Sequence, residues 1–182
     1  MRVIAGEFRS RRLVSLPGDS TRPTPDRLRE ALFSILMPVI EGALFVDAFA
    51  GTGAVGIEAI SRGARMVTFV EHDRRAQALI AENLAHCGVE NGYAIIRARV
   101  ERAAEDFPVA SLDIVLLDPP YDEPAETVAA VIASAGEALA PGGLLVLEHA
   151  RRRPSPETAG PLVRVRQVTS GDSALSFYSC PP

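Results

Sequence analysis

The sequence has 182 residues, of which 47% are hydrophobic, and this length and composition fit one globular domain with a core of its own. The net charge of −4 excludes a uniformly basic protein, and the 14 glycines and 14 prolines follow no period, which excludes collagen-like and solenoid architectures. The two cysteines, Cys87 and Cys180, form no metal or redox pattern. The N-terminus is charged and no apolar run could span a bilayer, so we expect a cytoplasmic protein with reduced thiols.

Residues 1–20 are predicted to form a small basic arm, and residues 21–182 a single domain. Residues 2–16 alternate loosely and carry turn residues, which indicates a short β-hairpin. Four arginines and one acid lie in the first twelve residues, and arginine suits bidentate contact with phosphate. All 19 basic residues of the chain are arginine, however, so the preference for arginine over lysine carries little functional weight.

After the arm, Thr24 and Pro25 are suited to begin a helix that extends to Leu36. From residue 44 onward, apolar strands alternate with helices, which predicts a parallel sheet with helices on both faces. The predicted strands are 44–49, 66–71, 93–97, 112–117, 144–148, 162–169 and 174–178. The predicted helices between them are 55–62, 74–86, 101–107 and 126–139. The last two strands are joined by a turn at 170–172, so the fold class is a doubly wound, seven-stranded α/β sheet with an antiparallel closing hairpin.

A glycine-rich loop follows the first strand of this sheet. Residues 51–56 match G-x-G-x-x-G and open a helix, and Glu71 lies twenty residues after Gly51. On this motif alone, a nicotinamide dinucleotide and S-adenosylmethionine both remain possible cofactors. Asp47 favours the second, because a pyrophosphate avoids a nearby carboxylate, whereas an ammonium and a sulfonium group accept one. A tight turn without a ligand is the alternative.

The most informative motif is Asp118-Pro119-Pro120-Tyr121, which follows the predicted strand 112–117. The two prolines stiffen the backbone and remove two N–H donors, so the motif forms a rigid ledge with a carboxylate, a free carbonyl and an aromatic ring. Asp118 and a proline carbonyl, that of Pro119 first, can each accept one hydrogen of an exocyclic amine on a planar base. Tyr121 can stack on that base. A proline-stiffened structural loop is the alternative.

These motifs resemble the RsmD-like family, bacterial methyltransferases that modify the N2 amine of a guanine in 16S ribosomal RNA. The resemblance spans nearly the whole chain and rests on residues 2–6, 21–24, 26–33, 47–54, 58–64, 118–121 and 171–178. It implies a class I methyltransferase fold of the Rossmann-like type and S-adenosylmethionine as the cofactor. It also implies 16S rRNA within the assembled small subunit as the partner and guanine 966 as the type of target.

The resemblance also implies roles for individual residues. The segment with Arg22 and Thr24 helps to close the cofactor pocket, and Arg99 and Val100 offer backbone groups to the adenine where relatives carry an acid or amide. The cofactor-binding residues expected are Arg22, Thr24, Asp47, Phe49, Ala50, Gly51, Thr52, Gly53, Glu71, His72, Arg99, Val100 and Asp118. The catalytic residues expected are Asp118, Pro119, Pro120 and Tyr121. The RNA-binding residues expected are Arg2, Arg9, Arg11 and Arg12.

Other functions remain open at this stage. Adenine-N6 methylation of DNA and glutamine-N5 methylation of protein use a similar proline-proline-tyrosine ledge that usually begins with Asn, and Asp118 with the arginine-rich arm favours RNA. A nicotinamide oxidoreductase and an RNA-binding module without activity are alternatives of other classes. The arginines at 151–153 fit a solvated charge run better than a phosphate contact. The histidines lack the spacing of metal ligands, so we expect no metal site. We also expect a monomer.

Overall fold

The computed structural model describes residues 1–15, 26–120 and 122–181. The strands are β1 (Leu44–Ala48), β2 (Met66–Val70), β3 (Tyr93–Ile96), β4 (Leu112–Leu117), β5 (Leu139–Ala150), β6 (Thr158–Ala159), β7 (Leu162–Ser170) and β8 (Ser173–Ser179). The helices are α1 (Asp26–Leu36), α2 (Ala54–Ser61), α3 (Arg74–His86), α4 (Val100–Glu105) and α5 (Ala125–Ala138). The expected start of the first helix at Thr24 and Pro25 lies outside the described residues.

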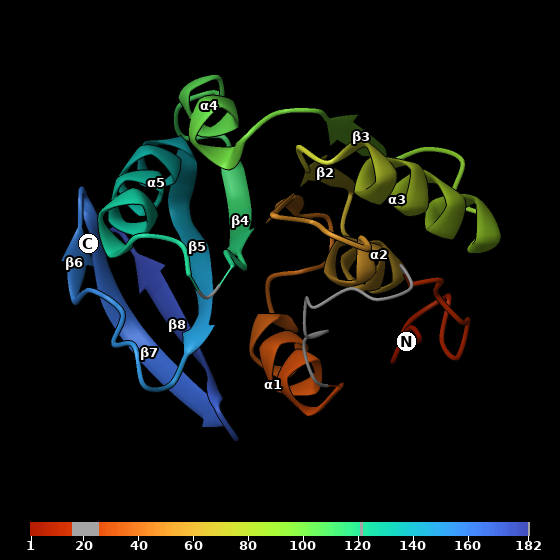
Figure 1. Ribbon diagram of the computed structural model, residues 1–182, viewed down its shortest axis with the longest axis horizontal. Helices are drawn as coiled ribbons and strands as arrows, with labels where there is room; N and C mark the ends of the chain where they lie inside the picture. The colour runs from red at the N-terminus through yellow and green to blue at the C-terminus, as the bar shows by residue number, and fades with distance from the viewer. Residues whose placement is uncertain (16–25, 121, 182) are drawn as a thin grey trace.

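The strands form one sheet in the order β3-β2-β1-β4-β5-β8-β7-β6 (Figure 1). The first five strands in this order are parallel, and β8, β7 and β6 each run antiparallel to the strand before. The order changes direction at β1, because β2 and β4 lie on either side of it. Doubly wound sheets bind their ligands at such a switch point, beyond the carboxyl ends of the strands. The predicted fold class with its closing hairpin is confirmed.

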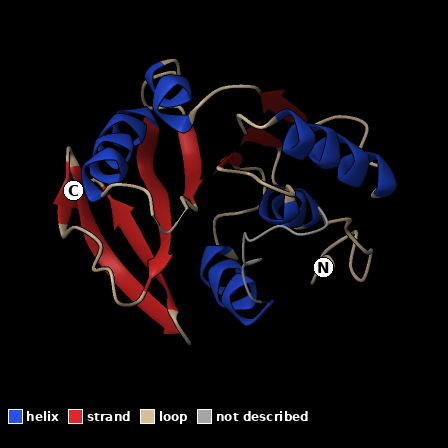
Figure 2. Ribbon diagram, viewed as in Figure 1, coloured by secondary structure: helices blue, strands red, loops and turns tan. Residues whose placement is uncertain are grey.

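Helices cover both faces of the sheet, as Figure 2 shows. The core on one face packs α1, α2 and α3 against Phe45 of β1 and Ile114 of β4. The core on the other face packs α4 and α5 against Val46 and Val115, the next residues along the same strands. Successive side chains of a strand point to opposite faces, so a strand buried on both faces is mainly apolar, as β1 and β4 are apart from Asp47 and Asp113. None of the helices in the described part of the chain is long and apolar enough to cross a membrane.

Two details of the sheet differ from the predicted boundaries. Strand β5 begins at Leu139, five residues before the predicted start, because Leu139 pairs with Leu112 before residues 140–143 bulge out opposite Asp113. The sequence Pro141-Gly142-Gly143 looks like a break between elements but lies inside this bulge. The two residues of β6 pair with the start of β7 and add an eighth strand, which is too short to give a sequence pattern.

The arm packs on the domain rather than extending from it. Arg2 and Arg12 form one antiparallel bridge, and the side chains of Val3, Phe8 and Leu13 are buried in the same core as α1, α2 and α3. Ser10, at the turn of the arm, has φ 70°, a left-handed conformation that a glycine adopts more readily. The turn therefore forms with serine at this position. A boundary at residue 20 stays a prediction, since residues 16–25 are not described.

Candidate active site

Three carboxylates gather at the carboxyl ends of neighbouring strands. Asp47 lies near the end of β1, Glu71 follows β2, and Asp118 follows β4. Backbone hydrogen bonds join the chain segments that carry these carboxylates. Ala50 N–H donates to the Val70 carbonyl at 3.1 Å, and Asp118 N–H donates toward the Ala48 carbonyl at 3.4 Å. Residues 24 to 71 positions apart in the sequence thus meet at the switch point of the sheet, where ligands of such folds bind.

Asp47 is a buried carboxylate that shapes the glycine loop. Asp47 is only 2% exposed. Its Oδ2 accepts a hydrogen bond of 2.8 Å from the N–H of Gly56, in the first turn of α2. Burial raises the pKa of Asp47 to about 8; the bond from Gly56 opposes this shift, and the charges of Asp118 and Glu71 add to it. The Gly56 N–H is therefore already used and is not available to a pyrophosphate.

The glycine loop combines conformational strain with open space. Phe49, Gly51 and Gly53 all have positive φ, of 65°, 53° and 75°. For a bulky residue such as Phe49 this conformation costs on the order of 1–3 kcal/mol and is concentrated at functional sites. A Cβ on Gly51 would meet only the Phe49 carbonyl, at 3.9 Å, so the loop presents an open backbone surface there. The Thr52 carbonyl accepts a 3.0 Å hydrogen bond from Asn83, which holds the loop in place.

Glu71 is oriented for ligand binding by two backbone donors. Oε2 accepts from Gly51 N–H at 3.0 Å, and Oε1 accepts from Asp73 N–H at 2.8 Å. His72 lies next to it, with Nδ1 3.2 Å from Glu71 Oε1 and an exposed ring. A carboxylate has about four acceptor positions, so Glu71 keeps capacity for a hydroxyl donor of a ribose, chiefly on Oε2.

Arg99 and Val100 lie where β3 gives way to α4. Arg99 is the residue before the helix, its side chain is exposed, and its carbonyl accepts the 3.0 Å hydrogen bond of Ala103 N–H. Val100 is buried and is the first helical residue, so its own N–H has no partner within the helix. Of the two backbone groups expected to meet an adenine, the N–H of Val100 is the better suited.

The proline ledge begins at Asp118, which is partly buried, and continues with Pro119, which is buried, and Pro120, which is exposed. The Pro120 carbonyl accepts a 2.9 Å hydrogen bond from Glu123 N–H and so closes a turn. That carbonyl is used within the chain, which favours the Pro119 carbonyl as the second acceptor for a substrate amine. Tyr121 lies outside the described residues, as do Arg22 and Thr24, and their expected roles stay predictions.

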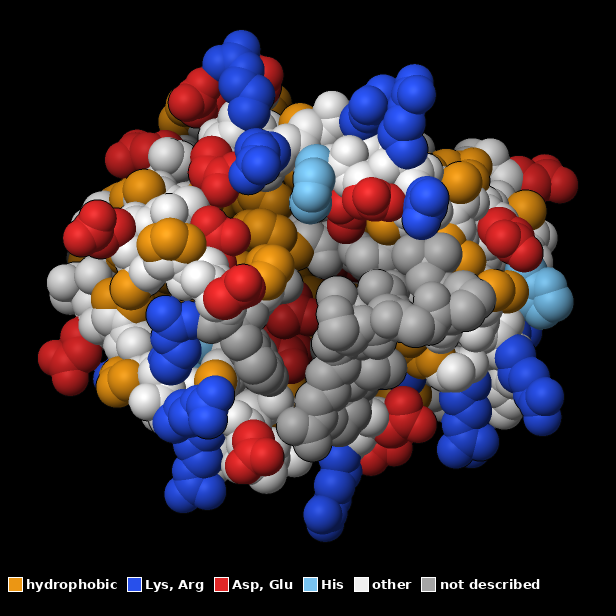
Figure 3. All heavy atoms as spheres, viewed as in Figure 1, with side chains coloured by type: hydrophobic (Ala, Val, Ile, Leu, Met, Phe, Trp, Pro, Cys, Tyr) orange, Lys and Arg blue, Asp and Glu red, His pale blue; other side chains and the backbone are white. Residues whose placement is uncertain are grey.

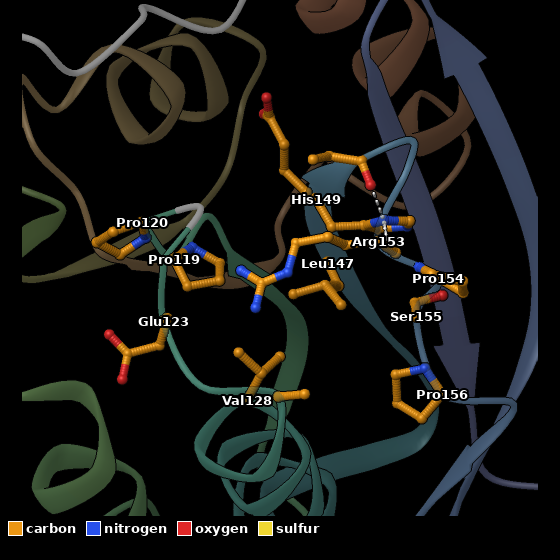
Figure 4. A pocket seen from close by; sticks show the side chains of 13 residues that line it. Pro119, Pro120, Glu123, Val128, Leu147, His149, Arg153, Pro154, Ser155 and Pro156 are labelled. Carbon is orange, nitrogen blue, oxygen red and sulfur yellow. Dashed lines mark hydrogen bonds between the residues drawn. The ribbon is translucent and has the colours of Figure 1, made fainter.

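A hollow of about 470 Å³ opens beside the ledge (Figure 4). Its walls are the ledge, the end of β5, the first turn of α5 and the loop at 150–156. A smaller hollow of about 190 Å³ reaches from here to Phe49 of the glycine loop, and Pro119, Glu123 and Val128 line both. Figure 3 shows apolar side chains in a hollow near the centre of this face, with acidic side chains around it. The volume of the first hollow includes space that is open to solvent.

The arginines of the arm differ in their surroundings. All four are exposed, but Arg11 also donates to the Cys87 carbonyl and lies 4.9 Å over the ring of Phe8. Arg29, a buried residue of α1, holds the backbone of Arg2 through a 2.9 Å hydrogen bond to its carbonyl. Arg9 and Arg12 therefore have the greatest freedom to contact a partner.

Comparisons with known proteins now decide the family. The model of the family described as "Conserved hypothetical protein 95" matches residues 1–179. The "Ribosomal RNA small subunit methyltransferase D" of Haemophilus influenzae is 34% identical over 182 residues, 98% of this chain and 93% of that protein. The chain belongs to the RsmD-like family.

Further relatives agree with this assignment. The protein YlbH of Bacillus subtilis is 34% identical over 180 residues, which are 98% of each chain. The solved structure of yhhF from Escherichia coli superposes with a TM-score of 0.81 and 32% identity, covering 99% of this chain and 97% of that one. The class I methyltransferase fold is confirmed, and membership in a methyltransferase family implies the use of S-adenosylmethionine. Both this membership and the bond from Gly56 to Asp47 argue against a nicotinamide oxidoreductase.

Several residues at this RsmD-like site are not indicated by any sequence motif. Asn83 is fully buried and joins the arm to the glycine loop, by bonds to Val14 N–H, the Val14 carbonyl and the Thr52 carbonyl. Glu123, His149 and Arg153 line the hollow beside the ledge. Each comes from a helix, strand or loop without a motif, so only the folded chain brings it to the site. Within residues 1–15, 26–120 and 122–181, no cluster of three or more His, Cys, Asp or Glu side chains is placed to hold a metal ion.

Proposed function

We propose that this protein transfers a methyl group from S-adenosylmethionine to the exocyclic N2 amine of a guanine in bacterial 16S rRNA. The observation that carries the proposal is the position of the Asp118-Pro119-Pro120 ledge, whose first N–H points to the Ala48 carbonyl directly before the glycine loop. The ledge, which can accept the hydrogens of an amine, thus lies beside the cofactor crevice. By this we mean the space at Asp47, Gly51 and Glu71 that is expected to hold a sulfonium compound. The name of the Haemophilus influenzae relative supports ribosomal RNA of the small subunit as the substrate.

The residues of the crevice suit S-adenosylmethionine. Glu71, with both oxygens fixed by backbone N–H groups, accepts hydrogen bonds from the ribose hydroxyls. The open backbone of Gly51 allows close approach of the methionine part, and the negative charge of Glu71 and Asp118 favours its cationic groups. When bound, S-adenosylmethionine supplies an electrophilic methyl group.

The ledge prepares the amine for attack. Asp118 and the Pro119 carbonyl each accept one N–H of the amine, which favours a pyramidal nitrogen whose lone pair is no longer delocalised into the ring. That lone pair forms the new N–C bond while the S–C bond breaks, and Asp118 takes up the released proton or passes it to water. Much of the acceleration comes from in-line positioning of the two reacting atoms.

The finer identity of the substrate follows the resemblance of the sequence to its family. Guanine 966 is the target that it implies, presented on the assembled small subunit to a monomeric enzyme. Asp118 in place of the Asn that usually opens the ledge of adenine-N6 and glutamine-N5 enzymes supports a different acceptor from theirs.

The deciding experiment is methylation of small ribosomal subunits isolated from cells that lack the modification. We expect incorporation of one methyl group per subunit, and mass mapping of nuclease fragments to locate it on N2 of one guanine. Methylated adenine, methylated glutamine or no incorporation at all would refute the proposal. Free 16S rRNA in a parallel reaction tests whether the assembled particle is needed.

A further inference from the structure

The hollow beside the ledge is lined by two acidic residues, Glu123 and Glu148, and by Arg153 and His149, between apolar walls. Glu123 comes from the turn before α5, and Arg153 comes from the loop after β5. Pro119, Val128 and Leu147 supply apolar surface between them. Figure 4 shows the Arg153 guanidinium reaching into the hollow, towards the side formed by Pro119 and Glu123.

We propose that Arg153 and Glu123 select guanine in this hollow, Arg153 by donating to O6 and N7 of the base and Glu123 by accepting its N1–H. This inference rests on the proposed function and names the residues that give it base specificity. Guanine presents N2 and N1 as neighbouring donors on one edge, followed by the acceptors O6 and N7. A bidentate arginine is the commonest partner of O6 and N7, and a carboxylate is the natural acceptor for N1–H.

The order of these groups along the base matches the order of residues along the hollow. With N2 held by Asp118 and the Pro119 carbonyl, the ring extends away from the cofactor crevice into the hollow. N1 lies next to N2, and Glu123 lies next to the ledge, since its N–H bonds the Pro120 carbonyl. O6 and N7 lie further along the ring, and Arg153 enters from the loop after β5, on the opposite wall.

A directed chain of hydrogen bonds fixes the backbone from which Arg153 projects. His149 Nδ1 lies 2.9 Å from the Arg153 carbonyl, so this nitrogen carries the hydrogen. In the neutral ring, Nε2 then accepts the Ser176 hydroxyl at 2.9 Å. The Ser176 oxygen accepts in turn from the Ser155 hydroxyl at 2.7 Å, and Ser155 accepts from Arg164 at 2.9 Å. Such preorganisation lowers the entropic cost of holding a guanidinium against a base.

The same pair disfavours adenine. Adenine has an amino group where guanine has O6 and an acceptor where guanine has N1–H. The Arg153 donors would therefore face a donor, and the Glu123 acceptor would face an acceptor. A polar mismatch of this sort, enclosed once a base fills the hollow, discriminates more strongly than apolar packing does. All three arginines at 151–153 are exposed, but Arg151 and Arg152 do not line the hollow.

The test compares two bases at the target position of reconstituted small subunits, guanine and 2-aminopurine. The second base keeps the N2 amine but lacks O6 and N1–H. The wild-type protein is expected to prefer guanine in kcat/KM by about 10- to 1000-fold. Arg153→Ala is expected to lower kcat/KM for guanine by about 10- to 100-fold and to change that for 2-aminopurine little, so that the preference collapses. Glu123→Gln is expected to reduce the same preference.

Arg152→Ala is the matched control and is expected to keep the wild-type preference. A role of Arg153 in folding alone would lower both rates equally and leave the ratio unchanged, and that result overturns the inference. Arg153→Gln carries the same comparison if the alanine variant does not fold, as judged by its melting temperature and its affinity for S-adenosylhomocysteine. If the wild-type protein methylates no guanine subunits, the proposed function itself fails, and this is distinct from methylation with an unchanged ratio.

Discussion

Glu58 of α2 accepts a hydrogen bond of 2.6 Å at Oε2 from the backbone N–H of Ile4, 54 residues earlier in the chain. Its other oxygen accepts from Ala5 N–H at 3.0 Å and from Arg62 Nε at 2.8 Å, and the Glu58 side chain is fully buried. Ser61, one turn later, receives the N–H of Phe8 on its hydroxyl. The arm is thus bonded to α2, the helix that follows the glycine loop. A change that disturbs the packing of the arm on α2 is therefore expected to alter the cofactor site.

Gly6 of the arm lies against Ser61 of α2 without room for a side chain, and it yields a stability prediction. A Cβ at Gly6 would lie 1.8 Å from the Ser61 carbonyl oxygen, and its φ is 80°. Gly6→Ala is therefore expected to destabilise the fold by roughly 2–4 kcal/mol in urea unfolding. Gly42→Ala is the matched control, because Gly42 has a similar φ of 75° but nothing within 4 Å of its Cβ. The control should lose only the conformational cost, about 1 kcal/mol. Equal losses in the two variants would show that the arm is not seated on Ser61.

Asp47 gives the fold a dependence on pH. Its pKa is raised from 3.8 to about 8 in the folded protein, so the folded state keeps a proton that the unfolded state has lost between these values. The contribution of Asp47 to stability is complete below pH 3.8 and declines as pH rises through about 8. Asp47→Asn keeps an oxygen acceptor for Gly56 N–H and removes the titration. Between about pH 6 and about pH 8.5, the wild-type protein is expected to lose roughly 1–3 kcal/mol more than this variant.

Urea unfolding at the two pH values provides the measurement for Asp47. Asp106→Asn serves as the control, because Asp106 is an exposed side chain in α4's final turn region and should leave the pH dependence of the wild type intact. If Asp47→Asn shows the same loss of stability with pH as the wild type, Asp47 is already ionised in the folded protein at neutral pH.

The sequence was sufficient for the fold and for those parts of the site that follow strands. The carboxyl ends of parallel strands meet at one edge, so Asp47, Glu71 and Asp118 were predictable as neighbours from strand order alone. The bulge in β5 was not, because its proline and glycines are typical of a loop and only pairing with Leu112 places them in a strand. The sequence predicts a solvated charge run at 151–153, and all three arginines are exposed. Only Arg153 lines the hollow, because of the turn after β5, and no sequence periodicity indicates that turn.

Arg9 and Arg12 of the arm are expected to contact RNA phosphates, in contrast to Arg11. Each phosphate contact that is lost should reduce the slope of log K against log salt by about 0.7–0.9, so the double variant Arg9→Ala/Arg12→Ala should flatten it by up to about 2. Its melting temperature should stay unchanged, because both side chains are exposed. Arg11→Ala should instead lower the melting temperature, since Arg11 bonds the Cys87 carbonyl and covers Phe8. Binding to small subunits at several salt concentrations gives the slopes, and an unchanged slope in the double variant would remove these two arginines from the interface.

Asp118 separates the chemistry from cofactor binding. If it accepts an amine hydrogen and the released proton, Asp118→Ala should reduce kcat by at least about 100-fold and leave the affinity for S-adenosylhomocysteine within about tenfold. Asp118→Asn keeps one acceptor oxygen but cannot take the proton, so its kcat should fall between those of the wild type and the alanine variant. Asp122→Ala, an exposed acid four residues along the chain, is the control and should keep wild-type kcat.

The two readouts for Asp118 must diverge for the assigned role to hold. Its charge raises the pKa of the buried Asp47, so the carboxylate is near enough to the crevice to affect cofactor binding as well as transfer. A small gain or loss of affinity on neutralising Asp118 is therefore expected from this through-space effect alone. Parallel losses of affinity and kcat would instead make Asp118 a cofactor ligand first, and the amine would then need another acceptor to prepare it for attack.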